Sequence, residues 1–180
     1  MKMADAIDLS LSAGSIDRAI SALNSRYREV RSKADDICER TAQFAEGLAA
    51  AYYEGYAGPE IQGGPPRVWK EKYSDGHGYH VYASGSPMYP EGNTVMFYEF
   101  GSGTAAGADN PIAAKVGARP GSWSSTYGTG EFAANKQWHH GEDENGEPII
   151  YTAIDGTNAM YRTGQDARER MKQLMQREFK

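Results

Sequence analysis

The sequence predicts an α+β fold, in which a mainly antiparallel sheet packs with one long N-terminal helix and one C-terminal helix. Three observations support this class. Apolar residues recur every three or four positions from residue 16 to about residue 56, which is the period of an amphipathic helix. Short β-prone segments follow up to residue 100, and a second helical period closes the chain. A long loop insertion rich in glycine, alanine, serine and acids, residues 101–148, interrupts this order.

Length and composition indicate one domain over residues 1–180, with a core formed by 1–100 and 149–180 and an extended arm formed by 101–148. The only cysteine is Cys38, so a disulfide within the chain is excluded. The first residues lack the apolar core of a signal peptide, and no apolar run is long enough to span a membrane. We therefore expect synthesis in a cytoplasm and no membrane association. The net charge of -5 argues against a protein whose whole surface follows phosphate backbones.

The first expected element is a short strand, because Ile7, Leu9 and Leu11 alternate with polar residues. Ser15 is the expected N-cap of the helix that follows. If that helix runs unbroken to about Tyr56 it measures roughly 60 Å at 1.5 Å per residue, which exceeds the width of a domain of this size. Part of it must then contact something else, unless it breaks in the charged stretch 25–36. Two interpretations of its apolar stripe stay open: packing on the chain's own sheet, or a coiled coil with a partner.

Residues 67–74 and 79–85 are β-rich and flank the turn DGHG, which predicts a hairpin. Its two faces are mixed, with Val68, Lys70 and Lys72 on one side and Trp69, Glu71 and Tyr73 on the other, and this pattern is typical of an edge or of an interface. The apolar run 94–100 predicts a central strand. Residues 148–154 predict another strand, and 156–179 predict the closing helix.

The glycines Gly101, Gly103 and Gly107 follow the apolar run 95–100 with a spacing that resembles a dinucleotide-binding loop. Such a loop needs a helix directly after it and an acid about twenty residues further on, and ADNPIAAK with its Pro111 provides neither. We therefore expect no cofactor. The glycines instead allow the chain to leave its sheet.

The other polar candidates also favour structural interpretations. The four histidines lack the spacing of a zinc site, and the acids lack the spacing of a calcium loop, so we expect no metal and a solvated acidic tip. The histidines are His77, His80, His139 and His140, and the acids are Glu142, Asp143, Glu144 and Glu147. Cys38 occupies an apolar helical position, where a small buried side chain is expected rather than a nucleophile.

Glu99 lies among Phe97, Tyr98 and Phe100, where a charge is costly unless it is paired with an arginine or with backbone donors. As an alternative, such a buried acid could serve a hydrolase. In the long loop, the large aromatic residues Trp123, Tyr127 and Trp138 either anchor the loop or face a partner.

The element order and several motifs resemble the neck or tail-completion proteins of long-tailed bacteriophages, which join head to tail. The motifs are SLSAGSIDRAISALNSRYREV at the start, FYEFGSGT at residues 97–104, NPIAAKVGARPGSW and NKQWHH in the loop, and AIDGTNAMYRTGQDARERM near the end. The most specific piece is the run Tyr98, Glu99, Phe100 and Gly101, followed by Thr104. One departure is that such proteins commonly place a proline and a phenylalanine at residues 159–161.

The resemblance implies a non-enzymatic structural protein of the virion, a subunit of a homo-oligomeric ring that contacts neighbouring connector, head-closure and tail proteins. DNA would pass through such an assembly without sequence-specific binding. The expected interface residues are Trp69, Glu99, Phe100, Gly101, Trp123, Tyr127 and Trp138. Two alternatives stay open: a small hydrolase that uses Glu99 with His80 or a loop acid, and a binding module of a mobile element.

Overall fold

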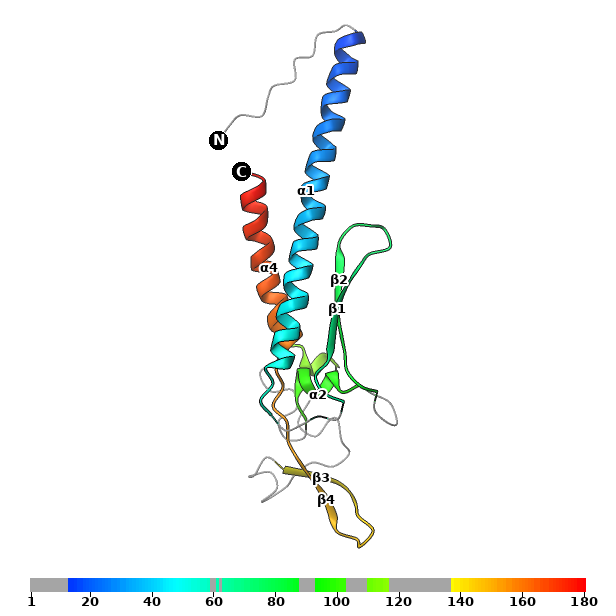
Figure 1. Cartoon of the computed structure of the whole chain (residues 1–180), viewed down its shortest axis with the longest axis vertical. Helices are drawn as coiled ribbons and strands as arrows, with labels where there is room; N and C mark the ends of the chain where they lie inside the picture. The colour runs from blue at the N-terminus through cyan, green and yellow to red at the C-terminus, as the bar shows by residue number, and fades with distance from the viewer. Residues whose placement is uncertain (1–12, 59–60, 62, 88–92, 103–109, 117–136) are drawn as a thin grey trace.

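Helix α1 (Ala13–Glu54) is the longest element of the computed structural model (Figure 1). Its 42 residues span about 63 Å at 1.5 Å per residue. The predicted single long helix is confirmed, and the charged stretch 25–36 does not break it. Ser15 is the third residue of the helix, so its predicted role as N-cap is wrong. The structure describes residues 13–58, 61, 63–87, 93–102, 110–116 and 137–180, and the predicted strand around Ile7–Leu11 lies outside them.

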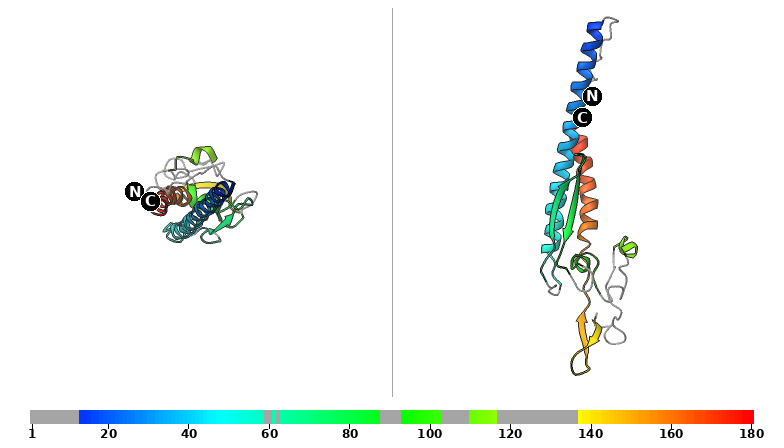
Figure 2. Two further views of the ribbon diagram at one scale, coloured as in Figure 1. Left: turned by 90° about the horizontal axis from the view of Figure 1, so that it is seen from above. Right: turned by 90° about the vertical axis from the view of Figure 1, so that its right-hand side faces the viewer.

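Two elements cover the C-terminal half of α1 along its length. Helix α4 (Ala159–Glu178) packs against it, and the antiparallel hairpin of β1 (Arg67–Lys72) and β2 (Tyr79–Ser84) packs on another side (Figures 1 and 2). Small residues of α1 let these neighbours approach closely, since Ala42, Ala45 and Ala49 are all buried. The chain therefore has the predicted α+β class, with the predicted hairpin and closing helix in place.

The apolar run before Gly101 forms a short helix, α2 (Val95–Phe100), so the predicted central strand is wrong. Its start is fixed by Asn93, whose side-chain oxygen accepts hydrogen bonds from the amides of Val95 at 3.0 Å and Gly85 at 2.7 Å. Such a local side-chain bond to the second following amide favours a helical start over an extended chain. The run ends at Gly101, whose φ of 76° suits glycine and whose amide donates to Phe97 at 2.8 Å.

The core lies at the base of α1, where the ends of α1, α2 and α4 meet. Its fully packed members are Tyr53, Ile61, Tyr98 and Ala159. The ring of Tyr98 meets that of Tyr53 edge-on, with centroids 6.1 Å apart. The core extends past residue 100 into the segment predicted as arm, because Ser102, Asn110 and Ala113 are buried as well.

The end of the predicted arm contributes the first strand of a second antiparallel hairpin, and the strand predicted at 148–154 is confirmed as its second strand. Strand β3 (Gln137–Glu142) pairs with β4 (Pro148–Thr152), with an irregularity in register between His139 and Glu142. A 3-10 turn, η2 (Ala113–Val116), precedes it in the chain. The β3–β4 hairpin projects past the core, at the opposite end of the molecule from the N-terminus of α1 (Figure 1). The molecule is thus long, with a helical end and a hairpin end.

Candidate interaction surfaces

Glu99 is buried, with 5% of its surface exposed, and its carboxylate accepts hydrogen bonds from four donors. Two of them are backbone amides in the first turn of α4, those of Met160 at 2.9 Å and Tyr161 at 3.2 Å. The others are the hydroxyl of Tyr53 at 3.1 Å and the side-chain amide of Asn110 at 3.4 Å. Of the partners predicted for this acid, backbone donors are confirmed.

The carboxylate of Glu99 replaces the missing cap of α4. Asn158 precedes this helix in the left-handed conformation, with φ of 54°, and makes no side-chain capping bond. A negative charge at a helix N-terminus satisfies the unpaired amides and interacts favourably with the helix dipole. Burial, and next the charge of Glu99, raise the pKa of the Tyr53 hydroxyl far above its usual value, so Tyr53 stays a donor. Glu99 thereby ties α2, α1 and α4 together.

The backbone around Glu99 also holds α2 against residues 156–158, which lead into α4. The carbonyl of Tyr98 accepts from the amide of Thr157 at 2.7 Å, and the carbonyl of Glu99 accepts from Asn158 at 3.1 Å. Gly156 lies against the end of α2 so closely that a Cβ atom there would meet the carbonyl oxygen of Glu99 at 2.5 Å. The structure therefore places Glu99, Phe100 and Gly101, three predicted interface residues, inside the chain.

The N-terminal half of α1 presents an apolar seam to solvent. Its members are spaced alternately by four and three residues, and between 42% and 62% of each is exposed: Ile16, Ile20, Leu23, Tyr27 and Val30. We call this set the exposed seam. Ile37, at the continuation of the same spacing, is only 2% exposed. One apolar pattern therefore runs along the whole helix. Its second half is largely covered, although Phe44 is 38% exposed, whereas the exposed seam is not covered by the described part of the chain. Beside the exposed seam, Ser15 and Ala19 are buried.

The exposed seam leaves the body of the molecule at the tip of the β1–β2 hairpin. There, the side chain of Arg31 donates to Nε2 of His77 at 2.9 Å, and Nδ1 of His77 lies 3.9 Å from Asp35. A hollow of about 390 Å³ opens at this junction, lined by Tyr27, Val30, Arg31, Ala34, Asp35, Cys38, His77 and Gly78. Cys38 is half-buried at its wall, not fully buried as predicted. The hollow joins the exposed seam to the hairpin.

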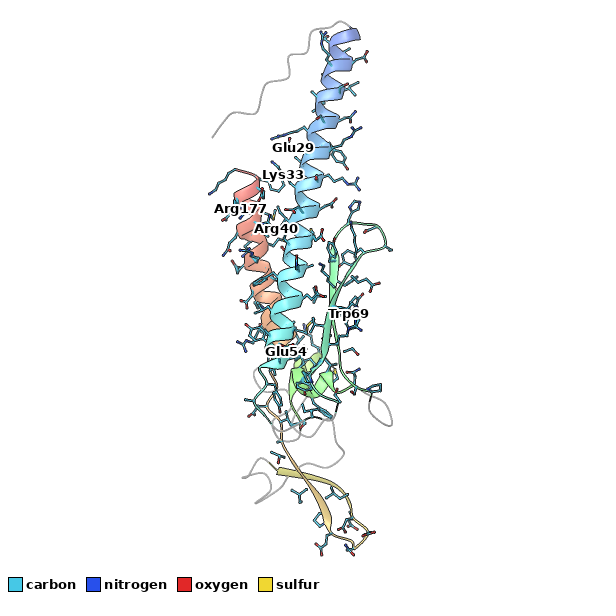
Figure 3. The ribbon with its side chains drawn as sticks, viewed as in Figure 1. Glu29, Lys33, Arg40, Glu54, Trp69 and Arg177 are labelled. Carbon is cyan, nitrogen blue, oxygen red and sulfur yellow. The ribbon has the colours of Figure 1, made fainter. Side chains whose placement is uncertain are left out.

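The β1–β2 hairpin has two different faces. Val68 and Ala83, directly opposite each other, pack against the core. On the other face lie Trp69, Tyr73, His80 and Tyr82, which we call the aromatic face. The rings of Trp69 and Tyr82 stack with centroids 5.3 Å apart, His80 lies 5.4 Å from Tyr82, and Tyr73 lies 4.0 Å from His80. Trp69 is labelled on the hairpin in Figure 3.

The described part of the β3–β4 hairpin is exposed throughout residues 142–150, including Ile149 and Ile150. The predicted acidic tip is its turn, in which Asp143 accepts from the amides of Asn145 at 2.8 Å and Glu147 at 2.9 Å. These amides, that of Glu147 first, lower the pKa of the Asp143 carboxyl. Asp143 therefore stabilises the turn at the end of this hairpin.

Several predicted residues have no described side-chain environment. Trp123 and Tyr127 lie outside the described residues. Trp138 stands opposite Tyr151 in the register of β3 and β4.

His80, proposed as a partner of Glu99 in a hydrolase, belongs to the aromatic face, while the described contacts of Glu99 are with α1, α4 and Asn110. The structure does not bring these two side chains into one described site.

Within the described ranges, no group of three or more histidine, cysteine or acidic side chains is arranged to hold a metal ion. None of the helices described is both long and apolar enough to cross a membrane. Comparison of the chain with protein-family models, with curated proteins and with solved structures finds no match. The function must therefore be inferred from the surfaces.

Proposed function

We propose that this chain is a structural subunit of the head–tail junction of a long-tailed bacteriophage, a neck or tail-completion protein that assembles into a ring and joins tail to capsid through protein contacts. The observation that carries the proposal is the exposed seam. A helix of about 63 Å has its apolar pattern covered by the rest of the chain along only half of its length. Uncovered apolar seams of heptad spacing favour a protein partner.

The other surfaces support the same role. The aromatic face carries side chains that dominate protein interfaces. The β3–β4 hairpin projects from the body with both strands exposed where described, and a lone two-stranded hairpin is marginally stable in water. Three separate surfaces thus need neighbours, as expected for a subunit that completes its burial on assembly. The sequence resemblance supplies the identity of the assembly.

The proposal makes the protein non-enzymatic and places it in the virion, with other copies of itself and neighbouring connector, head-closure and tail proteins as partners. DNA would pass along the assembled ring without sequence-specific contacts. In this role Glu99 acts inside the subunit, because it holds the base of α1 to α4.

The test is the mass of the purified protein over a wide range of concentrations, alone and with purified tails or capsids, by native mass spectrometry. We expect a ring, or a monomer that becomes a ring on its tail or capsid partner. Leu23→Asp in the exposed seam should abolish the ring, whereas Ser21→Asp, on another side of the same exposed helix, should leave it intact. A strict monomer that ignores both partners would contradict the proposal.

A further inference from the structure

The exposed seam and the aromatic face are two surfaces of different kind on one chain. The exposed seam is a convex row of mainly aliphatic side chains on a single helix. The aromatic face is a ladder of stacked rings on a two-stranded sheet, whose opposite face already packs against α1 and the core. The hairpin is thus covered by a helix on one face only, within the described residues.

We propose that the exposed seam of one copy docks on the aromatic face of a neighbouring copy, so that each hairpin is held between two α1 helices, its own and its neighbour's. This inference rests on the proposed function as a ring subunit and names the contact that joins the subunits. The occupant of each aromatic face is therefore the exposed seam of a second copy of this chain.

The two surfaces match in length and in chemistry. From Ile16 to Val30 the exposed seam spans about 21 Å at 1.5 Å per residue. The six-residue strands of the hairpin span about 20 Å. Aliphatic side chains that pack on rigid aromatic rings bury a large apolar area at little cost in side-chain entropy.

Contacts between cations and aromatic rings also favour this pairing. Between residues 17 and 33, α1 carries five basic and two acidic side chains, although the whole chain has a net charge of -5. The aromatic face carries Arg67 as well as Glu71, which lies opposite His80 in the register, and its rings can accept arginine cations on their faces. By contrast, two exposed seams paired in parallel would place Arg26 of one helix near Arg31 of the other, since these residues flank the seam. Like charges there disfavour parallel pairing of two seams.

The contact has a consequence for symmetry. It joins two different surfaces, so it repeats head to tail and closes into a ring when the rotation permits. The hairpin lies beside its own α1 between Arg31, at the tip, and Tyr53, at the base. The centre of that span is about 20 residues from Leu23, which corresponds to roughly 30 Å along the helix. Neighbouring subunits must therefore be displaced along their long axis, and α1 must lie inclined to the ring axis.

The test uses two variants of the full chain that each destroy one surface. The seam variant carries Leu23→Asp and Ile20→Asp, and the face variant carries Trp69→Thr and Tyr82→Thr, with threonine chosen to keep β propensity. Matched controls are Ser21→Asp for the helix and Lys72→Thr for the hairpin. Circular dichroism and the melting temperature establish that each variant is folded before its mass is measured.

Each variant alone should be a monomer, with association weakened at least about 100-fold, and the controls should assemble as the wild type does. A mixture of the two variants retains one intact pair of surfaces, so it should give a 1:1 heterodimer and nothing larger. Formation of this heterodimer also shows that each variant has kept its other surface.

Four outcomes overturn the inference. Absence of a heterodimer in the mixture, with both variants folded, excludes the contact. If the face variant forms dimers and the seam variant does not, two exposed seams pair with each other in antiparallel orientation. Rings that persist in both variants exclude this joint and remove the exposed seam as support for the proposed function, although the chain would still be a ring subunit. A wild-type chain that stays monomeric even with tails and capsids overturns both.

Discussion

The two halves of α1 share one helix and one apolar spacing but have opposite environments. Ile20, in the N-terminal half, is 51% exposed, whereas Ile37, in the C-terminal half, is 2% exposed. The C-terminal half is held by α4, the β1–β2 hairpin and the base that Glu99 ties together. An apolar period therefore predicts that a helix packs against another surface, but it does not predict which chain supplies that surface. The interpretation of the stripe as packing within the chain holds for the C-terminal half, and a protein partner for the N-terminal half stays a prediction.

Hydrogen exchange should show the largest difference between the two halves. In the Leu23→Asp variant, held monomeric, amides near residues 20–30 should exchange at least about 1,000-fold faster than amides near residues 45–53. The first group opens by local unravelling of a solvated helix, whereas the second opens only when the core unfolds. Mass spectrometry of peptic peptides resolves the boundary, which we expect near residue 35. Equal protection of both halves would mean that the N-terminal half is held by the rest of its own chain.

A matched pair of isoleucine substitutions should separate the halves in stability. Ile37→Ala removes a buried side chain and leaves a cavity, so it should lower the free energy of unfolding by about 2–4 kcal/mol. Ile20→Ala removes an exposed one and should change the unfolding of the monomer by no more than about 0.5 kcal/mol. Urea denaturation at low protein concentration measures both. Similar losses for the two variants would contradict the division of α1 proposed above.

Patterns that depend on local spacing were predicted well from the sequence. The expected helix from Ile16 to Tyr56 occurs as Ala13–Glu54, and the expected hairpin has the predicted alternation of faces. Both follow from periods of 3.6 and 2.0 residues, which require no knowledge of distant parts of the chain.

Features that depend on tertiary context were predicted less well. The run Val95–Phe100 has the composition of a strand, and a short apolar run cannot be assigned to strand or helix from its period. The available signal was Asn93 and Thr94 directly before it, since such residues often start helices. Backbone donors for Glu99 were expected, but Met160 and Tyr161 lie 61 and 62 positions away, and no local pattern connects them. The capping of α4 by Glu99 therefore could not be predicted from the sequence and required the structure.

The stability of the core at the base of α1 should depend on the charge of Glu99. Glu99→Gln keeps the shape of the side chain but offers one acceptor oxygen in place of two, and its amide hydrogens would face backbone donors of α4. We expect a loss of about 2 kcal/mol in the free energy of unfolding. Glu39→Gln, at an exposed position of α1, is the control and should have little effect. Urea denaturation measures the cost, and equal costs at both positions would exclude the capping role.

The ion pair between Arg40 and Glu178, at 3.5 Å, marks the place where α4 ends and its cover of α1 stops, and Figure 3 shows Arg40 on the side of α1 that faces α4. The pKa of Glu178 is lowered, first by its hydrogen bond to Arg177 and to a smaller extent by Arg40. A carboxyl with a lowered pKa in the folded state stabilises the fold above its unfolded value of 4.5, and this contribution is lost as the pH falls through the folded pKa.

This contribution should be the smallest of the effects predicted here, because both side chains are partly solvated. Arg40→Met should lower the melting temperature at pH 7 by about 1 °C, and this effect should shrink as the pH falls through the folded pKa of Glu178. Arg177→Met should have a smaller effect on melting despite the stronger local bond, because neighbours in sequence stay close together in the unfolded chain. Scanning calorimetry over a series of pH values from 7 downward distinguishes the variants. A larger effect for Arg177→Met would show that the local bond contributes more to stability than the contact between the two helices does at this boundary.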